Sequence, residues 1–228
     1  MTPPCRPARG VGIVTIGQSP RPDVVPGIAA LLPAGTTVIE RGALDDLGGA
    51  DLASLTPAPG DGLLVSRLRD GTEVALAESR LLPRVQSAVD HVTGRGAAVV
   101  AVLCTGPLPG LSCPRPLLQP GALVRSLVSA AAGRGRIGVV VPAPGQAQLA
   151  AAEWSGMAGP VLVQAASPYG PPAALRRAAA ALAAWRPDLV VLDCIGFDAP
   201  MRQAVAETVG VPVILPRTVL AGALAALL

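Results

Sequence analysis

The sequence predicts an α/β protein made of two parallel-sheet lobes that are related by pseudo-symmetry and enclose one cleft. Short apolar runs alternate with helical stretches along its 228 residues, which is typical of a parallel α/β architecture. Two of these runs, 97–107 (AAVVAVLCTGP) and 187–197 (PDLVVLDCIGF), each end in a cysteine and reach a glycine two residues later. The order also repeats, because VGIVTIGQSP opens one half and RIGVVVPAPGQ opens the other. Continuous apolar runs closed by a turn are typical of buried parallel strands.

The first lobe is expected to span residues 1–118. Asp23 is the predicted N-cap of a helix that runs to Leu32, and Asp70-Gly71 is a strong hairpin turn. The remaining expected elements are strands at 11–16 and 36–40, a loop at 42–60 with one helical turn at 50–55, hairpin strands at 63–68 and 73–76, a helix at 82–92 and the strand that ends at Cys104.

The second lobe is expected to span residues 119–211, after a proline-rich loop at 107–120. The segment 212–228 is expected to return to the first lobe and complete it. The expected elements are helices at 121–132, through Trp154, at 173–185 and at 200–208, strands at 136–141, 161–164 and up to Cys194, a turn at 167–170, and a closing strand at 211–215 with a terminal helix.

Composition excludes several function classes. The net charge is +3, every basic residue is an arginine, and the arginines form no run. With four aromatic residues in the chain, nucleic-acid binding is not expected. No apolar run approaches the ~18–20 residues that cross a bilayer, and MTPPCRPARG lacks the apolar region of a secretory signal. We therefore expect a cytoplasmic protein without membrane contact.

The cysteines carry the main functional hypothesis. The four cysteines form no CxxC pair and the chain has one histidine, which excludes the common zinc spacings and favours free thiols. Cys5 and Cys113 have no catalytic context. In open α/β sheets ligands bind beyond the carboxyl ends of the strands, where Cys104 and Cys194 lie. A lone cysteine that ends a core strand is usually packing, but two at matched positions favour function.

Two facing thiols suit proton transfer at the carbon beside a carboxylate. One thiolate removes a proton, and the other thiol returns one to the opposite face. A turn into a helix N-terminus lowers a thiol pKa, and the backbone N–H groups of Thr105-Gly106 and Ile195-Gly196 are predicted to bind a carboxylate or an enolate.

The sequence resembles the AroM family. The motifs that carry the resemblance extend over nearly the whole chain: VGIVTIGQSPRPD, GALDDL, SRLRDGTEV, LCTGPLP, VVPAPGQ, SPYG, LDCIGF and PVILPR. That family is similar to the aspartate/glutamate/hydantoin racemase superfamily. The resemblance implies two α/β lobes, no cofactor, no metal, and one catalytic cysteine per lobe.

Carried over by position, the resemblance makes Cys104 and Cys194 the catalytic pair. It makes Thr105 a carboxylate-binding residue, and it makes Ser19 a residue that holds substrate. The superfamily usually has Asn after the first cysteine and Thr-His after the second, where this chain has Thr105-Gly106 and Ile195-Gly196. The only histidine, His91, lies within a predicted helix. A further acid or base would therefore be another residue.

Other substrate-binding candidates rest on their predicted places at strand ends and turns. Arg21 and Arg67 could clamp a second carboxylate by bidentate contacts, although surface ion pairs are the alternative, favoured for Arg69. Gln18, Ser167 and Tyr169 lie in loops that should border the cleft. Asp193 is ambiguous, since a bare carboxylate would raise the pKa of the neighbouring thiol.

The leading hypothesis is a cofactor-independent racemase, epimerase or isomerase that acts on a small carboxylate by two-cysteine proton transfer. The alternatives are a non-catalytic carboxylate-binding or regulatory protein on the same fold, and a decarboxylase or lyase that needs one cysteine. The expected partner is a small-molecule carboxylate, and the sequence leaves a homodimer open.

Overall fold

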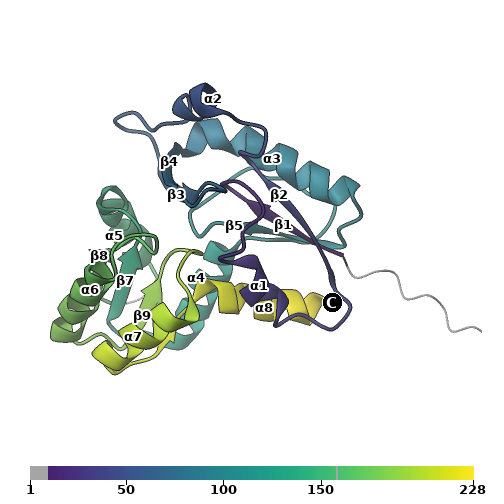
Figure 1. Cartoon of the computed structure of the whole chain (residues 1–228). Coiled ribbons are helices and arrows are strands. Elements are labelled where there is room, and N and C mark those ends of the chain that lie inside the picture. Colours follow the sequence, from purple (N-terminus) through teal and green to yellow (C-terminus); the bar gives the residue numbers. More distant parts are fainter. Residues whose placement is uncertain (1–9, 158) are drawn as a thin grey trace, which may run out of the picture.

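The computed structural model describes residues 10–157 and 159–228, and it has two four-stranded parallel sheets (Figure 1). Cys5 lies outside the described residues. The first sheet has the order β2-β1-β5-β6 and the second has the order β8-β7-β9-β10. If the hairpin β3–β4 is set aside, the two sheets have the same strand order: the second strand of each half is at one edge, followed by the first, third and fourth. The predicted α/β class with two parallel sheets is confirmed.

The strands of the first sheet are β1 (Gly10–Thr15), β2 (Thr37–Gly42), β5 (Val99–Leu103) and β6 (Leu117–Leu118). Those of the second sheet are β7 (Ile137–Val141), β8 (Val161–Ala165), β9 (Leu189–Leu192) and β10 (Val213–Ile214). Every residue of β1, β5, β7 and β9 is buried, because helices cover both faces of each sheet. This double covering is why these strands are apolar along their length instead of alternating, except for Thr15 at the end of β1.

The helices of the described chain lie between the strands and at the C-terminus. They are α1 (Val25–Ala29), α2 (Gly49–Ala53), α3 (Glu78–Gly94), α4 (Pro120–Ala132), α5 (Ala147–Ser155), which follows a 3₁₀ turn at Pro144–Gln146, α6 (Pro172–Trp185), α7 (Ala199–Val209) and α8 (Pro216–Leu227). None of the helices in the described ranges has the length and apolar character that crossing a bilayer requires.

The last helix of each half packs on the other half. Helix α4 follows the first sheet, yet Val124 and Val128 pack with β7 and β9 of the second. Helix α8 follows the second sheet, yet Leu220 and Leu224 pack with β1 and β5 of the first. Figure 1 shows the yellow helix α8 returning beside α1. Each buried Leu or Val contributes about 1.5–3 kcal/mol, so this exchange fixes the two halves relative to each other.

The hairpin β3 (Leu63–Arg67) and β4 (Glu73–Ala77) belongs to neither sheet. Its strands are antiparallel, and Gly71 takes the positive φ of 93° that the turn between them requires. The hairpin bridges the halves, because Gln146 Nε2 donates to the Leu63 carbonyl at 3.0 Å and the Ser167 hydroxyl bonds to Glu73. The hairpin predicted around Asp70-Gly71 is confirmed.

Three local expectations differ from the structure. Asp23 does not cap α1, because its carboxylate binds Arg21, and the helix ends at Ala29 instead of Leu32. The loop 107–120 contains the short strand β6, which pairs with β5. The segment 212–228 divides between the halves, since β10 pairs with β9 in the second sheet while α8 packs on the first.

Candidate active site

Cys104 and Cys194 occupy equivalent places in the two halves. Each follows the third strand of its sheet, β5 or β9, and each is buried. The Cys104 N–H donates to the Val102 carbonyl at 2.9 Å, and the Cys194 N–H donates to the Leu192 carbonyl at 2.8 Å. The same tight turn therefore ends both strands, and it places both thiols at the carboxyl edge of a parallel sheet, where ligands bind in this class of fold.

The glycine two residues after each cysteine directs its backbone N–H toward the ionised form of the thiol, as its effect on the thiol pKa indicates. The Gly196 N–H donates to Cys194 Sγ at 3.4 Å, and the Gly106 N–H lowers the pKa of Cys104 from the equivalent position. Burial raises the pKa of Cys104 to about 12 and that of Cys194 to about 11, and these N–H groups offset part of the rise. A charge on Cys194 raises the pKa of Cys104 further, so the two sulfurs interact electrostatically.

The surroundings make the two thiols unequal. After burial, the Asp193 carboxylate also raises the pKa of Cys194, whereas the cations Arg21 and Arg217 lower it. The pKa of Cys104 is raised by burial, by Cys194 and by the carboxylates of Asp193 and Glu78. The surrounding charges therefore favour the thiolate of Cys194 over that of Cys104.

Arg21 is held by other residues of the protein. It is 2% exposed, and its Nε and Nη2 donate to both oxygens of Asp23 at 2.8 and 2.7 Å. Further N–H groups donate to Thr15 Oγ1 at 3.1 Å and to the Tyr169 hydroxyl at 2.9 Å. Burial alone would lower the pKa of Arg21, but the bond to Asp23 raises it above its ordinary value. Arg21 is thus a buried cation that already binds the Asp23 carboxylate through two hydrogen bonds.

Tyr169 is the residue of the second half that faces this cation. Burial, followed by the nearby Cys194, raises the pKa of Tyr169, so its hydroxyl stays protonated. The guanidinium carbon of Arg67 lies over the Tyr169 ring, 5.4 Å from the ring centroid. Arg67 Nη1 lies 3.8 Å from Asp23 Oδ2. A Cβ atom on Gly196 would stand 2.4 Å from the Tyr169 hydroxyl oxygen, so only glycine permits this contact. Tyr169 is thereby packed directly against the loop that follows Cys194.

Arg217 was not predicted from the sequence as a site residue. It is buried at the start of α8, and its guanidinium donates to the carbonyls of Ile195 at 3.0 Å and of Gly196 at 2.9 Å. It also donates to the Asp23 carbonyl at 2.9 Å. Arg217 therefore ties the loop after Cys194 to the loop after β1. An arginine directly after the apolar run PVILP is the signal that could have indicated it.

Asp193 points away from the thiol of its neighbour. The Trp154 Nε1–H donates to Asp193 Oδ2 at 2.9 Å, and Thr105 Oγ1 donates to the Asp193 carbonyl oxygen at 3.1 Å. Burial raises the pKa of the Asp193 carboxyl, and the bond from Trp154 opposes the rise only in part. Thr105 and Asp193 thus join the two cysteine loops.

The predicted residues Gln18, Ser19 and Ser167 make contacts within the protein. Gln18 Oε1 accepts the Arg69 N–H at 3.0 Å, which holds the hairpin. The N–H and the hydroxyl of Ser19 both donate to Asp45, each at 2.7 Å. The Ser167 hydroxyl oxygen accepts the Tyr169 N–H at 3.0 Å and the hydroxyl bonds to Glu73. These three residues support the segments that carry Arg67 and Tyr169.

Two small cavities lie near these residues, and the first borders the cysteine loops. One lies between the halves and is lined by Glu78, Thr105, Gly106, Glu153 and Asp193, among others. The other lies between the loop after β1 and the hairpin, where Arg21, Asp23, Arg67 and Arg69 line it. Within residues 10–157 and 159–228, His, Cys, Asp and Glu side chains form no group of three that could hold a metal.

Two parallel-sheet halves of equal topology, with a buried thiol after the third strand of each, define a protein of the glutamate racemase-like α/β fold. Glutamate racemase from Aquifex pyrophilus superimposes with a TM-score of 0.59 at 13% identity, covering 96% of this chain and 84% of that chain. The chain belongs to the AroM family, whose model, described as AroM protein, matches residues 11–228. The resemblance seen in the sequence is confirmed.

Two further solved structures share the fold. Allantoin racemase from Klebsiella pneumoniae has a TM-score of 0.64 at 16% identity and covers 96% of this chain and 87% of that chain. A double mutant of arylmalonate decarboxylase in its liganded form, with one Gly-to-Cys and one Cys-to-Ser change, has a TM-score of 0.64 at 18% identity and covers 96% and 93%. No curated protein matches the sequence.

Proposed function

We propose that the protein is a racemase, epimerase or isomerase of a small carboxylate and that Cys104 and Cys194 transfer the protons. The observation that carries the proposal is the equivalence of the two thiols. Both follow the third strand of a sheet, the N–H of a glycine two residues on lowers the pKa of each thiol, and a charge on Cys194 raises the pKa of Cys104. Packing alone does not require the same local geometry at both positions.

In the proposed reaction Cys194 is the base. Because the pKa of Cys194 is about 11, only a small fraction of the protein carries its thiolate at neutral pH, and this fraction reacts. The thiolate removes the proton from the carbon beside the substrate carboxylate, and the electron pair of that C–H bond moves into the carboxylate as an enolate. Cys104, whose pKa is about 12, then donates its proton to the opposite face of the carbon. The product is the inverted carbon with Cys194 as thiol and Cys104 as thiolate, so the reverse turnover restores the starting state.

The charges around the site support this division of roles. Arg21 and Arg217 lower the pKa of Cys194. Of the arginines Arg21, Arg67 and Arg217, Arg67 is partly exposed, and it lies beside Tyr169. A carboxylate that binds Arg67 would sit next to the loop of Cys194. The small carboxylate partner expected from the sequence is therefore proposed to bind at Arg67.

A second candidate function is favoured by the raised thiol pKa values. With pKa values of about 12 and 11, both thiols carry a proton at neutral pH. A decarboxylase or lyase needs such a group, because loss of CO2 leaves an electron pair on carbon that must be protonated. One neutral thiol is sufficient for that step.

The test follows the α-carbon of candidate substrates in D2O by proton NMR, with CO2 release measured in parallel. For the two-cysteine reaction, Cys104→Ser and Cys194→Ser should each abolish racemisation, while Cys113→Ser, at a half-buried third thiol, should leave it intact. For the one-cysteine reaction only one of the two variants should lose CO2 release. Full racemisation by both single variants would reject the proposal, and carboxylate binding without exchange or CO2 release would indicate a binding protein.

A further inference from the structure

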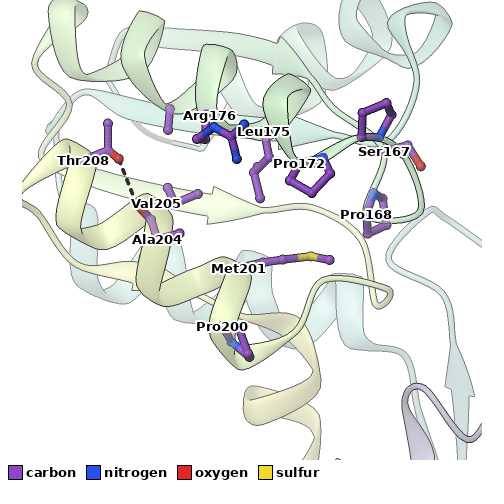
Figure 2. Close-up of a pocket in the computed structure, with 13 residues that line it drawn as sticks. Ser167, Pro168, Pro172, Leu175, Arg176, Pro200, Met201, Ala204, Val205 and Thr208 are labelled. Atoms are coloured by element: carbon purple, nitrogen blue, oxygen red, sulfur yellow. Dashed lines mark hydrogen bonds between the residues drawn. The ribbon is translucent and has the colours of Figure 1, made fainter.

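The second half carries an apolar groove that contains neither cysteine. It lies between α6 and α7, as Figure 2 shows, and has a volume of about 250 Å³. We call it the α6–α7 groove. Its walls are formed mainly by the apolar residues Pro168, Pro172, Leu175, Met201, Ala204 and Val205.

Polar groups of the groove are few, and one is a cation. Thr208 Oγ1 donates to the Ala204 carbonyl at 2.8 Å, the dashed line in Figure 2, so this hydroxyl is already paired. Arg176 lines the groove and is exposed, and no hydrogen bond or salt bridge joins its guanidinium to the rest of the described chain. No acidic side chain lines the groove. An apolar wall with one unpaired cation at its edge complements an apolar molecule that carries one negative charge.

The volume limits the size of the occupant. A cavity of about 150 Å³ is enough to hold benzene, so about 250 Å³ accommodates one ring or a branched alkyl group together with a short acid. We propose that the α6–α7 groove binds a small carboxylate with an aromatic or branched aliphatic body, its apolar part between α6 and α7 and its carboxylate at Arg176. This binding does not rest on the proposed function.

The groove adjoins the segments that position Cys194. Pro168, which lines the groove, lies so close to Gly196 that a Cβ atom on the glycine would stand 2.8 Å from Pro168 Cγ. The next residue, Tyr169, packs on the same glycine from the side of the site. Met201 lines the groove in the first turn of α7, the helix that follows the Cys194 loop. A bound ligand therefore touches the two segments whose packing fixes that loop.

The experiment titrates phenylacetate into the whole protein and measures the dissociation constant by ligand-observed NMR. Arg176→Gln should weaken binding about fivefold, the upper range of an exposed ion pair. Ala204→Trp fills the groove from an exposed position and should abolish binding. The matched controls are Arg177→Gln and Ala180→Trp, which change exposed α6 residues outside the groove and should leave binding unchanged. Phenylacetamide should bind about fivefold more weakly than phenylacetate and should be insensitive to Arg176→Gln.

Three results would overturn the inference. The first is absence of phenylacetate binding to the wild-type protein at millimolar concentration. The second is binding that survives Ala204→Trp. The third is binding that is lost in Arg67→Gln but unchanged in Arg176→Gln, because the ligand would then occupy the cysteine site. The Cys194→Ser variant, which changes the proposed reaction, should bind phenylacetate as the wild type does, so failure of one proposal leaves the other standing.

Discussion

Replacement of Asp193 by Asn should change the pH dependence of stability in a defined direction. Burial raises the pKa of this carboxyl in the folded protein, while in the unfolded chain it titrates near its ordinary ~3.9. The side-chain oxygen of Asn can still accept the Trp154 N–H that Asp193 accepts at 2.9 Å. The substitution therefore removes the ionisation and keeps the main contact.

The sign follows from which state holds the proton. Below pH ~3.9 the carboxyl is protonated in both the folded and the unfolded state, so it adds no pH dependence to the free energy of unfolding. As the pH rises above that value the unfolded chain ionises first, so the folded state holds more protons and the free energy of unfolding falls. One proton gives a slope of at most about 1.4 kcal/mol per pH unit. The free energy of unfolding continues to fall until the pH passes the raised pKa of Asp193 in the folded protein. Above that pH Asp193 causes no further change.

The assay is urea unfolding of the wild type and Asp193→Asn at pH values from 4 to 8. As the pH rises, the free energy of unfolding of the variant should increase relative to that of the wild type, because the variant lacks the ionisable group. Asp51→Asn, at an exposed carboxylate, is the control and should follow the wild type. Parallel profiles of Asp193→Asn and the wild type, or a wild type that gains on the variant, would refute the reasoning.

Three other outcomes follow from the site. Arg217→Met leaves the carbonyls of Asp23, Ile195 and Gly196 without this donor, so the free energy of unfolding should fall by about 1–3 kcal/mol in urea titrations; an unchanged midpoint would contradict the role given to Arg217. Gly196→Ala should lower the free energy of unfolding by about 1–3 kcal/mol, and the same change should lower it less in a Tyr169→Ala background. Equal losses in the two backgrounds would disprove the contact. Iodoacetamide labelling mapped by mass spectrometry should modify Cys194 about threefold faster than Cys104, because its larger thiolate fraction is partly offset by the lower nucleophilicity of the less basic thiolate. The reverse order would reject the stated asymmetry.

Much of the fold could be predicted because its signals are local. The apolar runs that end at Cys104 and Cys194 form central strands, and the Asp70-Gly71 turn forms its hairpin. The cap assigned to Asp23 is wrong because a local capping preference competes with a bidentate bond to Arg21 that only the fold brings into place. Strand β10 could not be assigned to its sheet, since two residues carry no pairing information.

The candidate site was predictable in part for the same reason. Cys104 and Cys194 stand at strand ends, which are visible in the sequence. Arg217, in contrast, lies more than 20 residues beyond the loop whose carbonyls it binds, and its place after the apolar run PVILP does not indicate those partners. Ser19 carries a hydroxyl suited to a substrate, but Asp45, from a distant loop, accepts its hydrogen bonds.

By itself the sequence determined the elements of the fold, the repeat of the two halves and the equivalent places of Cys104 and Cys194, because β-branched apolar runs, turns and helix periodicity act over a few residues. The tertiary structure decided which charges surround each thiol. Arg217 reaches the loops of Cys194 and Asp23 because α8 crosses back to the first half, and Arg21 meets Tyr169 across the two halves. Electrostatic interactions depend on distance in space, which residue order does not specify.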